Sequence, residues 1–114
     1  MDITRLAAVH ARWVEARSQL TAENIANADT PGYERAAGSS FGDMVSEAAR
    51  PFAMRATHAA HLAPEPVTPG FAVDHEGAVR LQSEMVDLAA HRRAHDLNVA
   101  VSAAFHRFQL SVAR

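Results

Sequence analysis

The segment from Asn24 to Tyr33 constrains this chain more than any other, because it has the composition of a helix end followed by a tight turn. Asn and Asp side chains hydrogen-bond to nearby backbone, and Thr30 precedes a proline, which biases it away from helical angles. Pro31 suits the first central position of a type II turn, and Gly32 supplies the positive φ that the second position needs. The upstream helix is therefore expected to end within this segment.

A long helix is predicted upstream, from Ile3 to about Asn27. Apolar residues recur there at spacings of three or four, which places them on one stripe of a helix. They are Ile3, Leu6, Val9, Trp13, Ala16 and Leu20. Trp13 is the one large anchor in the stripe. The pattern by itself fits an ordinary amphipathic helix of a small bundle equally well.

Helical periodicity disappears after the turn, apart from a short apolar cluster at 41–45 and one or two helical turns expected before Pro51. Pro64, Pro66 and Pro69 then favour extended backbone. The alternation that follows fits a short β-hairpin around Glu76-Gly77. A loop of roughly 40 residues is unusual in a compact domain, so the middle is either disordered or ordered by neighbouring molecules.

A second long helix is predicted from Ser83, as its N-cap, to near Val112, with Glu84 and Asp87 in the favourable first turn. Placing its residues at 100° per step separates two apolar faces. One face holds Met85, Leu88, Ala89, Val99, Ala103 and Leu110. The other holds Val86, Leu97, Val101, Phe105, Phe108 and Val112. One partner helix covers only one face, so the pattern favours self-assembly, with a third helix from the middle as the alternative.

These patterns predict a mainly α chain whose terminal helices, within 1–28 and 82–114, pack as a coiled-coil-like pair and form one core domain. Residues 29–81 are expected to form a largely irregular middle segment, ordered by neighbouring subunits. An apolar fraction of 48% with only 6% aromatic residues suits thin, closely spaced helices rather than a thick core.

The composition excludes several classes of protein. The chain has no cysteine, which excludes disulfides and thiolate metal sites, and its net charge of −2 does not favour nucleic-acid binding. The N-terminus lacks the basic start and apolar run of a cleavable signal peptide. No apolar run reaches the roughly 18 to 20 residues needed to span a bilayer.

Candidate chemistry is sparse. His91 and His95 share a helix face at metal-ligand spacing, and His58 and His61 form a second pair, but the cationic pair that follows His91 disfavours a dication there. No G-x-S-x-G elbow or glycine-rich phosphate loop is present. We therefore expect no enzyme activity, cofactor or small-molecule substrate. A helical metal-binding module using His91 and His95 remains as the alternative from a different functional class.

The ten residues from Asn24 to Tyr33 resemble the N-I-A-N-x-x-T-P-G-Y signature of flagellar axial proteins, which include rod, hook and hook-associated subunits. The matching positions are Asn24, Ile25, Ala26, Asn27, Thr30, Pro31, Gly32 and Tyr33. The segment from Gly77 to Met85 is similar to the lead into the family's terminal helix. Together with the small size and the Met54–Leu62 segment, these features resemble the proximal rod proteins of the FlgB type. Glu34 displaces the basic residue common just after the turn.

The resemblance implies a structural subunit that polymerises through its terminal helices, builds the proximal rod and transmits torque. It implies as partners copies of the chain, other rod subunits, an adaptor between rod and membrane ring, and the flagellar type III export apparatus. It implies a periplasmic position in the flagellar basal body, with export that needs no cleavable signal peptide. Another axial subunit, such as a second proximal rod protein, is the alternative within the family. The expected packing contacts are Leu6, Trp13, Leu20, Leu97, Val101, Phe105 and Phe108.

Overall fold

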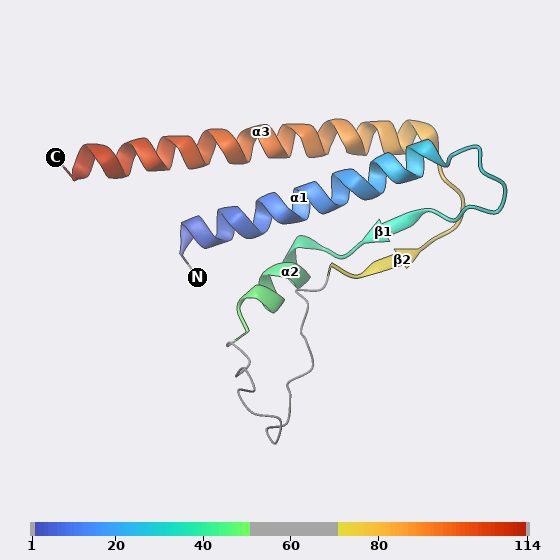
Figure 1. Ribbon diagram of the computed structural model, residues 1–114, viewed down its shortest axis with the longest axis horizontal. Helices are drawn as coiled ribbons and strands as arrows, with labels where there is room; N and C mark the ends of the chain where they lie inside the picture. The colour runs from blue at the N-terminus through green and yellow to red at the C-terminus, as the bar shows by residue number, and fades with distance from the viewer. Residues whose placement is uncertain (1, 51–70, 114) are drawn as a thin grey trace, which may run out of the picture.

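A computed structural model of the 114-residue chain describes residues 2–50 and 71–113. Two long helices lie side by side and antiparallel, with a small helix and a two-stranded sheet against the first of them (Figure 1). This confirms the predicted mainly α fold with paired terminal helices. The expected extended segment at Pro64, Pro66 and Pro69 and the pair His58 and His61 lie outside the described residues.

Helix α1 spans Ile3–Ala26, within one residue of its predicted end. The side chain of Asp2 caps its first turn by accepting a hydrogen bond from the backbone N–H of Arg5 at 2.8 Å. After the helix, the N–H of Tyr33 donates to the carbonyl of Thr30 at 3.2 Å, and Gly32 has φ of 74°. These are the features of a type II turn, as the sequence predicts.

Helix α3 spans Leu81–Val112, and its N-cap is Arg80, which makes no side-chain capping hydrogen bond. The expected N-cap at Ser83 is therefore wrong, because the cap lies three residues earlier, at Arg80. The N–H of Glu84 donates to the carbonyl of Arg80 at 3.0 Å, which is a helical hydrogen bond, so Ser83 lies inside the first turn of the helix. What holds Glu84 in place is a long-range contact, described below.

The described part of the middle segment packs along α1. Helix α2, Phe41–Ala48, begins with a capping box between Ser40 and Asp43, so the expected apolar cluster and helical turns form one helix. Strand β1, Ala36–Gly38, pairs antiparallel with strand β2, Val73–His75, and Ala36 lies opposite His75. The strand before Glu76-Gly77 is therefore present, but its partner is β1 instead of a strand after Gly77.

The core is thin and centred on α1. Its buried apolar side chains are Val9, Val14, Ala36 and Met44. Trp13 contacts Phe41 of α2, with ring centroids 5.6 Å apart, and its indole N–H donates to the carbonyl of Ser39 at 3.0 Å. Helix α1 thus lies between α3 and the described middle residues, whereas α3 packs against no other helix or strand in the described ranges (Figure 1). The proposed role of neighbouring subunits in ordering 29–81 stays a prediction.

Candidate assembly surface and polar clamp

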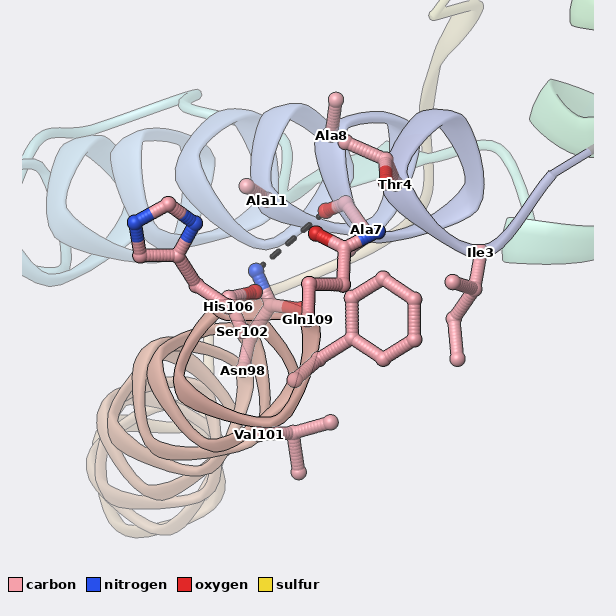
Figure 2. A pocket seen from close by; sticks show the side chains of 11 residues that line it. Ile3, Thr4, Ala7, Ala8, Ala11, Asn98, Val101, Ser102, His106 and Gln109 are labelled. Carbon is pink, nitrogen blue, oxygen red and sulfur yellow. Dashed lines mark hydrogen bonds between the residues drawn. The ribbon is translucent and has the colours of Figure 1, made fainter. Parts of the chain in front are cut away.

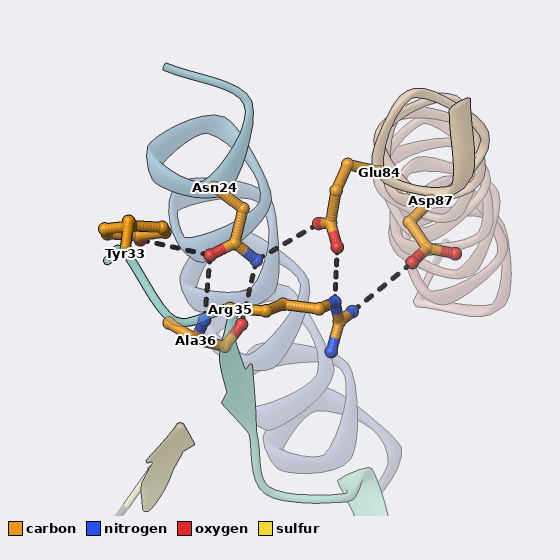
Figure 3. Close-up of polar contacts among 6 residues, drawn as sticks. All are labelled: Asn24, Tyr33, Arg35, Ala36, Glu84 and Asp87. Carbon is orange, nitrogen blue, oxygen red and sulfur yellow. Dashed lines mark hydrogen bonds and ion pairs between the residues drawn. The ribbon is translucent and has the colours of Figure 1, made fainter. Parts of the chain in front are cut away.

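The Asn24–Tyr33 motif contributes to a buried polar cluster at one end of the helix pair. We call it the polar clamp (Figure 3); it consists of Asn24, Tyr33, Arg35, Ala36, Glu84 and Asp87. These residues come from the end of α1, the turn, the start of β1 and the first turns of α3. The clamp therefore joins segments that are up to 60 residues apart in the sequence.

Asn24 is the centre of the clamp, and only 1% of its surface is exposed. Its Oδ1 accepts from the N–H of Ala36 at 2.8 Å and from the hydroxyl of Tyr33 at 3.1 Å. Its Nδ2 donates to the carbonyl of Ala36 at 2.9 Å and to Oε2 of Glu84 at 3.1 Å. The amide thus pairs with both backbone groups of one strand residue, as a neighbouring strand would. An amide is required here because the position needs a donor and an acceptor together.

Glu84 is the buried acid of the clamp, with 0% of its surface exposed. The guanidinium of Arg35 hydrogen-bonds and ion-pairs with Oε1 of Glu84, and a second nitrogen of Arg35 lies 3.7 Å from Asp87. A buried carboxylate is stable only when it is paired and hydrogen-bonded, and Asn24 and Arg35 together meet both requirements. Arg35 follows directly after Glu34, so the displaced basic residue next to the turn still reaches α3.

The remaining motif residues shape the corner. Nδ2 of Asn27 donates to the carbonyl of Glu23 at 2.9 Å, and the hydroxyl of Thr30 donates to Oδ1 of Asn27 at 3.3 Å. Thr30, Pro31 and Gly32 are exposed, as is Ala26, whereas Ile25 is half-buried. The motif thus combines buried clamp residues with an exposed turn. The sequence interpretation did not identify Arg35 as a member of the clamp. It assigned Glu84 to stabilisation of the helix dipole, because the local sequence around a carboxylate at a helix start does not indicate that the side chain is buried.

At the other end of the helix pair, the C-terminal half of α3 is apolar, poor in charge and exposed. Between residues 97 and 113 the only charged residue is Arg107. Three of the predicted packing residues lie there in the open: Leu97 is 65% exposed, Val101 49% and Phe108 63%. Of the other predicted contacts, Leu6 is exposed, whereas Trp13, Leu20 and Phe105 are half-buried. Such a surface, depleted in charge, is typical of the centre of a protein–protein interface.

A groove of about 340 Å³ runs between α1 and α3 at this end (Figure 2). Asn98 crosses its floor, where Nδ2 donates to the carbonyl of Ala7 at 3.2 Å. The lining side chains include no carboxylate, ammonium or guanidinium group; they are Ile3, Thr4, Ala7, Ala8, Ala11, Asn98, Val101, Ser102, Phe105, His106 and Gln109. Alanines on α1 keep the groove open, because their methyl groups do not fill the space between the helices.

His91 is buried at the α1–α3 contact, and its Nε2 has no hydrogen-bond partner. Burial of the imidazole and then the guanidinium of Arg17 lower the pKa of His91 below its ordinary value of 6.5, although Asp87 and Glu84 act in the opposite direction. His95, the second candidate metal ligand, is exposed. Across 2–50 and 71–113, no three His, Cys, Asp or Glu side chains are grouped to hold a metal ion. No helix in those ranges is long and apolar enough to span a membrane.

Comparisons with known proteins agree with the motif. A curated relative, the flagellar basal body rod protein FlgB of Agrobacterium fabrum, is 28% identical over 122 aligned residues. The alignment covers 96% of this chain and 91% of the relative. No family model and no solved structure matches the chain. Near full-length similarity, the Asn24–Tyr33 signature and the paired terminal helices all agree with a resemblance of this chain to the FlgB type of flagellar basal-body rod protein.

Proposed function

We propose that this chain is a structural subunit of the bacterial flagellar basal-body rod and that it polymerises through its terminal helices. The near full-length similarity to a flagellar basal body rod protein supports a structural role in the basal-body rod. The observation that supports polymerisation is the exposed, charge-poor half of α3, which no other element of the described chain covers.

The energetics favour covering this surface. Phe108 and Leu97 each keep about two thirds of their surface in water. Burying a large apolar side chain fully contributes about 1.5–3 kcal/mol, so each of these two would contribute about 1–2 kcal/mol on association. Repeated along a helix, contributions of this size offset the entropy lost when subunits associate. Among residues 2–50 and 71–113, α1 is the only helix or strand that packs against α3, so these exposed side chains gain nothing from that part of the chain.

The polar clamp suits a subunit that carries load. It ties the end of α1, the start of β1 and the start of α3 together through hydrogen bonds and an ion pair. Torque applied to either helix would pass through this cross-link to the other helix. Transmission of motor torque is therefore part of the proposal, with the clamp as the internal brace and the apolar surface as the contact between subunits.

The partners in this proposal are copies of the chain, other rod subunits, and an adaptor between the rod and the membrane ring. Its proposed position is the periplasmic rod of the basal body, reached through the flagellar type III apparatus without a cleavable signal peptide. We propose no enzymatic role. A second proximal rod protein is the alternative within the family, and locating the subunit in isolated basal bodies separates the two.

The test replaces Phe108 in cells whose only copy of the gene encodes the variant. Phe108→Asp puts a charge at an exposed position, so the single chain stays folded, whereas burial against a neighbour becomes unfavourable. We expect loss of swimming in soft agar and loss of the subunit from purified basal bodies, with normal amounts of protein made. Phe108→Leu is the matched control and should retain swimming. Normal motility of the Phe108→Asp strain would refute the packing proposal.

A further inference from the structure

The C-terminal end of α3 extends past the N-terminus of α1 (Figure 1). Helix α3 has 32 residues against 24 in α1, a difference of about 12 Å at 1.5 Å per residue. We call residues 108–112 the overhang. All five are exposed, and Phe108, Leu110 and Val112 retain 63%, 57% and 68% of their surface in water. The overhang is an exposed, mainly apolar helix end, and Gln109 is its one residue that also lines the groove between α1 and α3.

The groove between α1 and α3 has the complementary properties. It is uncharged, mainly apolar and about 340 Å³ in volume, which is at the small end of the range for ligand pockets, roughly 300–1,000 Å³. A space of this size accepts one or two large side chains. On the overhang, Phe108 and Val112 are four residues apart and therefore lie on the same face of the helix. The overhang carries no charged side chain, so nothing on it opposes entry into an uncharged groove.

We propose that the groove of one subunit receives the overhang of a second copy, with Phe108 and Val112 as the inserted side chains. This inference rests on the proposed function, because it names the contact through which the chain polymerises. Both features lie at the same end of the helix pair, because the residues that line the groove include the first residues of α1, and the overhang extends past the N-terminus of that helix. The contact therefore joins two different surfaces, a groove and a helix end, on each copy.

The register of the contact follows from the same placement. The centre of the overhang lies about eight residues beyond the groove residues Ser102 and Val101, or about 12 Å along α3. A parallel copy displaced by that distance places its overhang over the groove of the first. The first copy's own overhang stays free for another copy, so the contact repeats without closing. An open-ended repeat of this kind builds a filament, in contrast to a two-fold contact, which stops at a dimer.

Disulfide cross-linking tests this contact directly, because the native chain has no cysteine. We would prepare full-length Ala8→Cys, with the new thiol in the groove, and Ser111→Cys, with the thiol next to Phe108 on the overhang. Oxidation of the mixed variants should give a covalent heterodimer. Ala22→Cys is the matched control, because residue 22 is exposed on nearly the same side of α1, about four helical turns away.

The expected result is a heterodimer yield with Ala8→Cys about tenfold or more above that with Ala22→Cys, and its loss when Phe108→Asp is added to the overhang variant. The double variant Ala8→Cys/Ser111→Cys should give a ladder of multimers. A ladder that stops at dimer would overturn the open-ended register. Sedimentation velocity on the same samples distinguishes failure of this contact from failure of the polymerisation proposal. Oligomers without the Ala8–Ser111 cross-link would overturn this contact alone, whereas a chain that stays monomeric at all concentrations would overturn the polymerisation proposal as well.

Discussion

Replacing Asn24 with aspartate is the sharpest test of the polar clamp, because the two side chains have nearly the same shape. The change keeps Oδ1, which accepts from the N–H of Ala36 and the hydroxyl of Tyr33. It replaces Nδ2, the donor to the carbonyl of Ala36 and to Glu84, with a second oxygen. Two favourable contacts of 2.9 and 3.1 Å thereby become contacts between acceptors.

The expected loss of stability is large. Two carboxylates about 4 Å apart repel each other by about 4 kcal/mol at an effective dielectric constant of 20, and Arg35 offsets part of this. The two lost hydrogen bonds add about 1 kcal/mol each. A net destabilisation of about 3–6 kcal/mol is comparable to the total stability of many small domains, about 5–15 kcal/mol. The variant should therefore be largely unfolded at a urea concentration that leaves the native chain folded.

Urea unfolding followed by far-ultraviolet circular dichroism measures this loss, with Asn27→Asp as the matched control. Asn27 makes one side-chain donor bond, to the carbonyl of Glu23, so its replacement should lower the free energy of unfolding by only about 1 kcal/mol. Acidification should reduce the difference between Asn24→Asp and the native chain, because the introduced carboxyl group then becomes neutral. If Asn24→Asp is no more destabilised than Asn27→Asp, the clamp does not hold the helices in the way described.

Two further predictions concern packing at the α1–α3 contact and beside the sheet. Because burial and Arg17 lower the pKa of His91, its contribution to stability is complete above pH 6.5 and declines below it, by at most about 1.4 kcal/mol per pH unit. The difference in urea midpoint between the native chain and His91→Gln, measured from pH 7.5 to 5, should therefore shrink on acidification. A constant difference would contradict this prediction. Gly38→Ala should destabilise the chain by about 1–3 kcal/mol, because an added Cβ would lie 2.0 Å from the Phe71 ring. Gly42→Ala, where the nearest atom would be 3.7 Å away, is the control and should stabilise helix α2 slightly. Thermal melts of the two variants and the native chain measure both effects.

The two ends of the helix pair have opposite character, and this suits a subunit of a fibre. At the motif end, buried polar groups specify one arrangement of helix, strand and helix, because each group needs its partner. At the other end, apolar side chains on α3 have no partner within the described chain. In the proposed assembly, the first end would stiffen each subunit, and the second would supply the free energy for contact with the next subunit.

Local sequence rules determined the helices and the turn. The spacing of apolar residues in 3–20 and 85–112 identified both long helices, and Pro31-Gly32 identified the turn, because helix periodicity and turn angles depend on residues a few positions apart. The two apolar faces on α3 exceed what one partner helix covers, and Leu97 and Phe108 are exposed in the structure; their role as packing contacts between subunits stays a prediction.

Only the tertiary structure decided which distant residues meet. The partner of β2 is a strand at 36–38, and the partners of Glu84 are Asn24 and Arg35, 60 and 49 residues away. Local patterns assigned Glu84 to the helix dipole and Ser83 to the cap, because a carboxylate looks the same in sequence whether it is solvated or buried. The free energy that places it inside comes from the amide and guanidinium that surround it, and these come together only when the two helices pair. The ten-residue motif thus predicts the helix end and the turn from sequence alone, whereas the role of its buried asparagine depends on the tertiary fold.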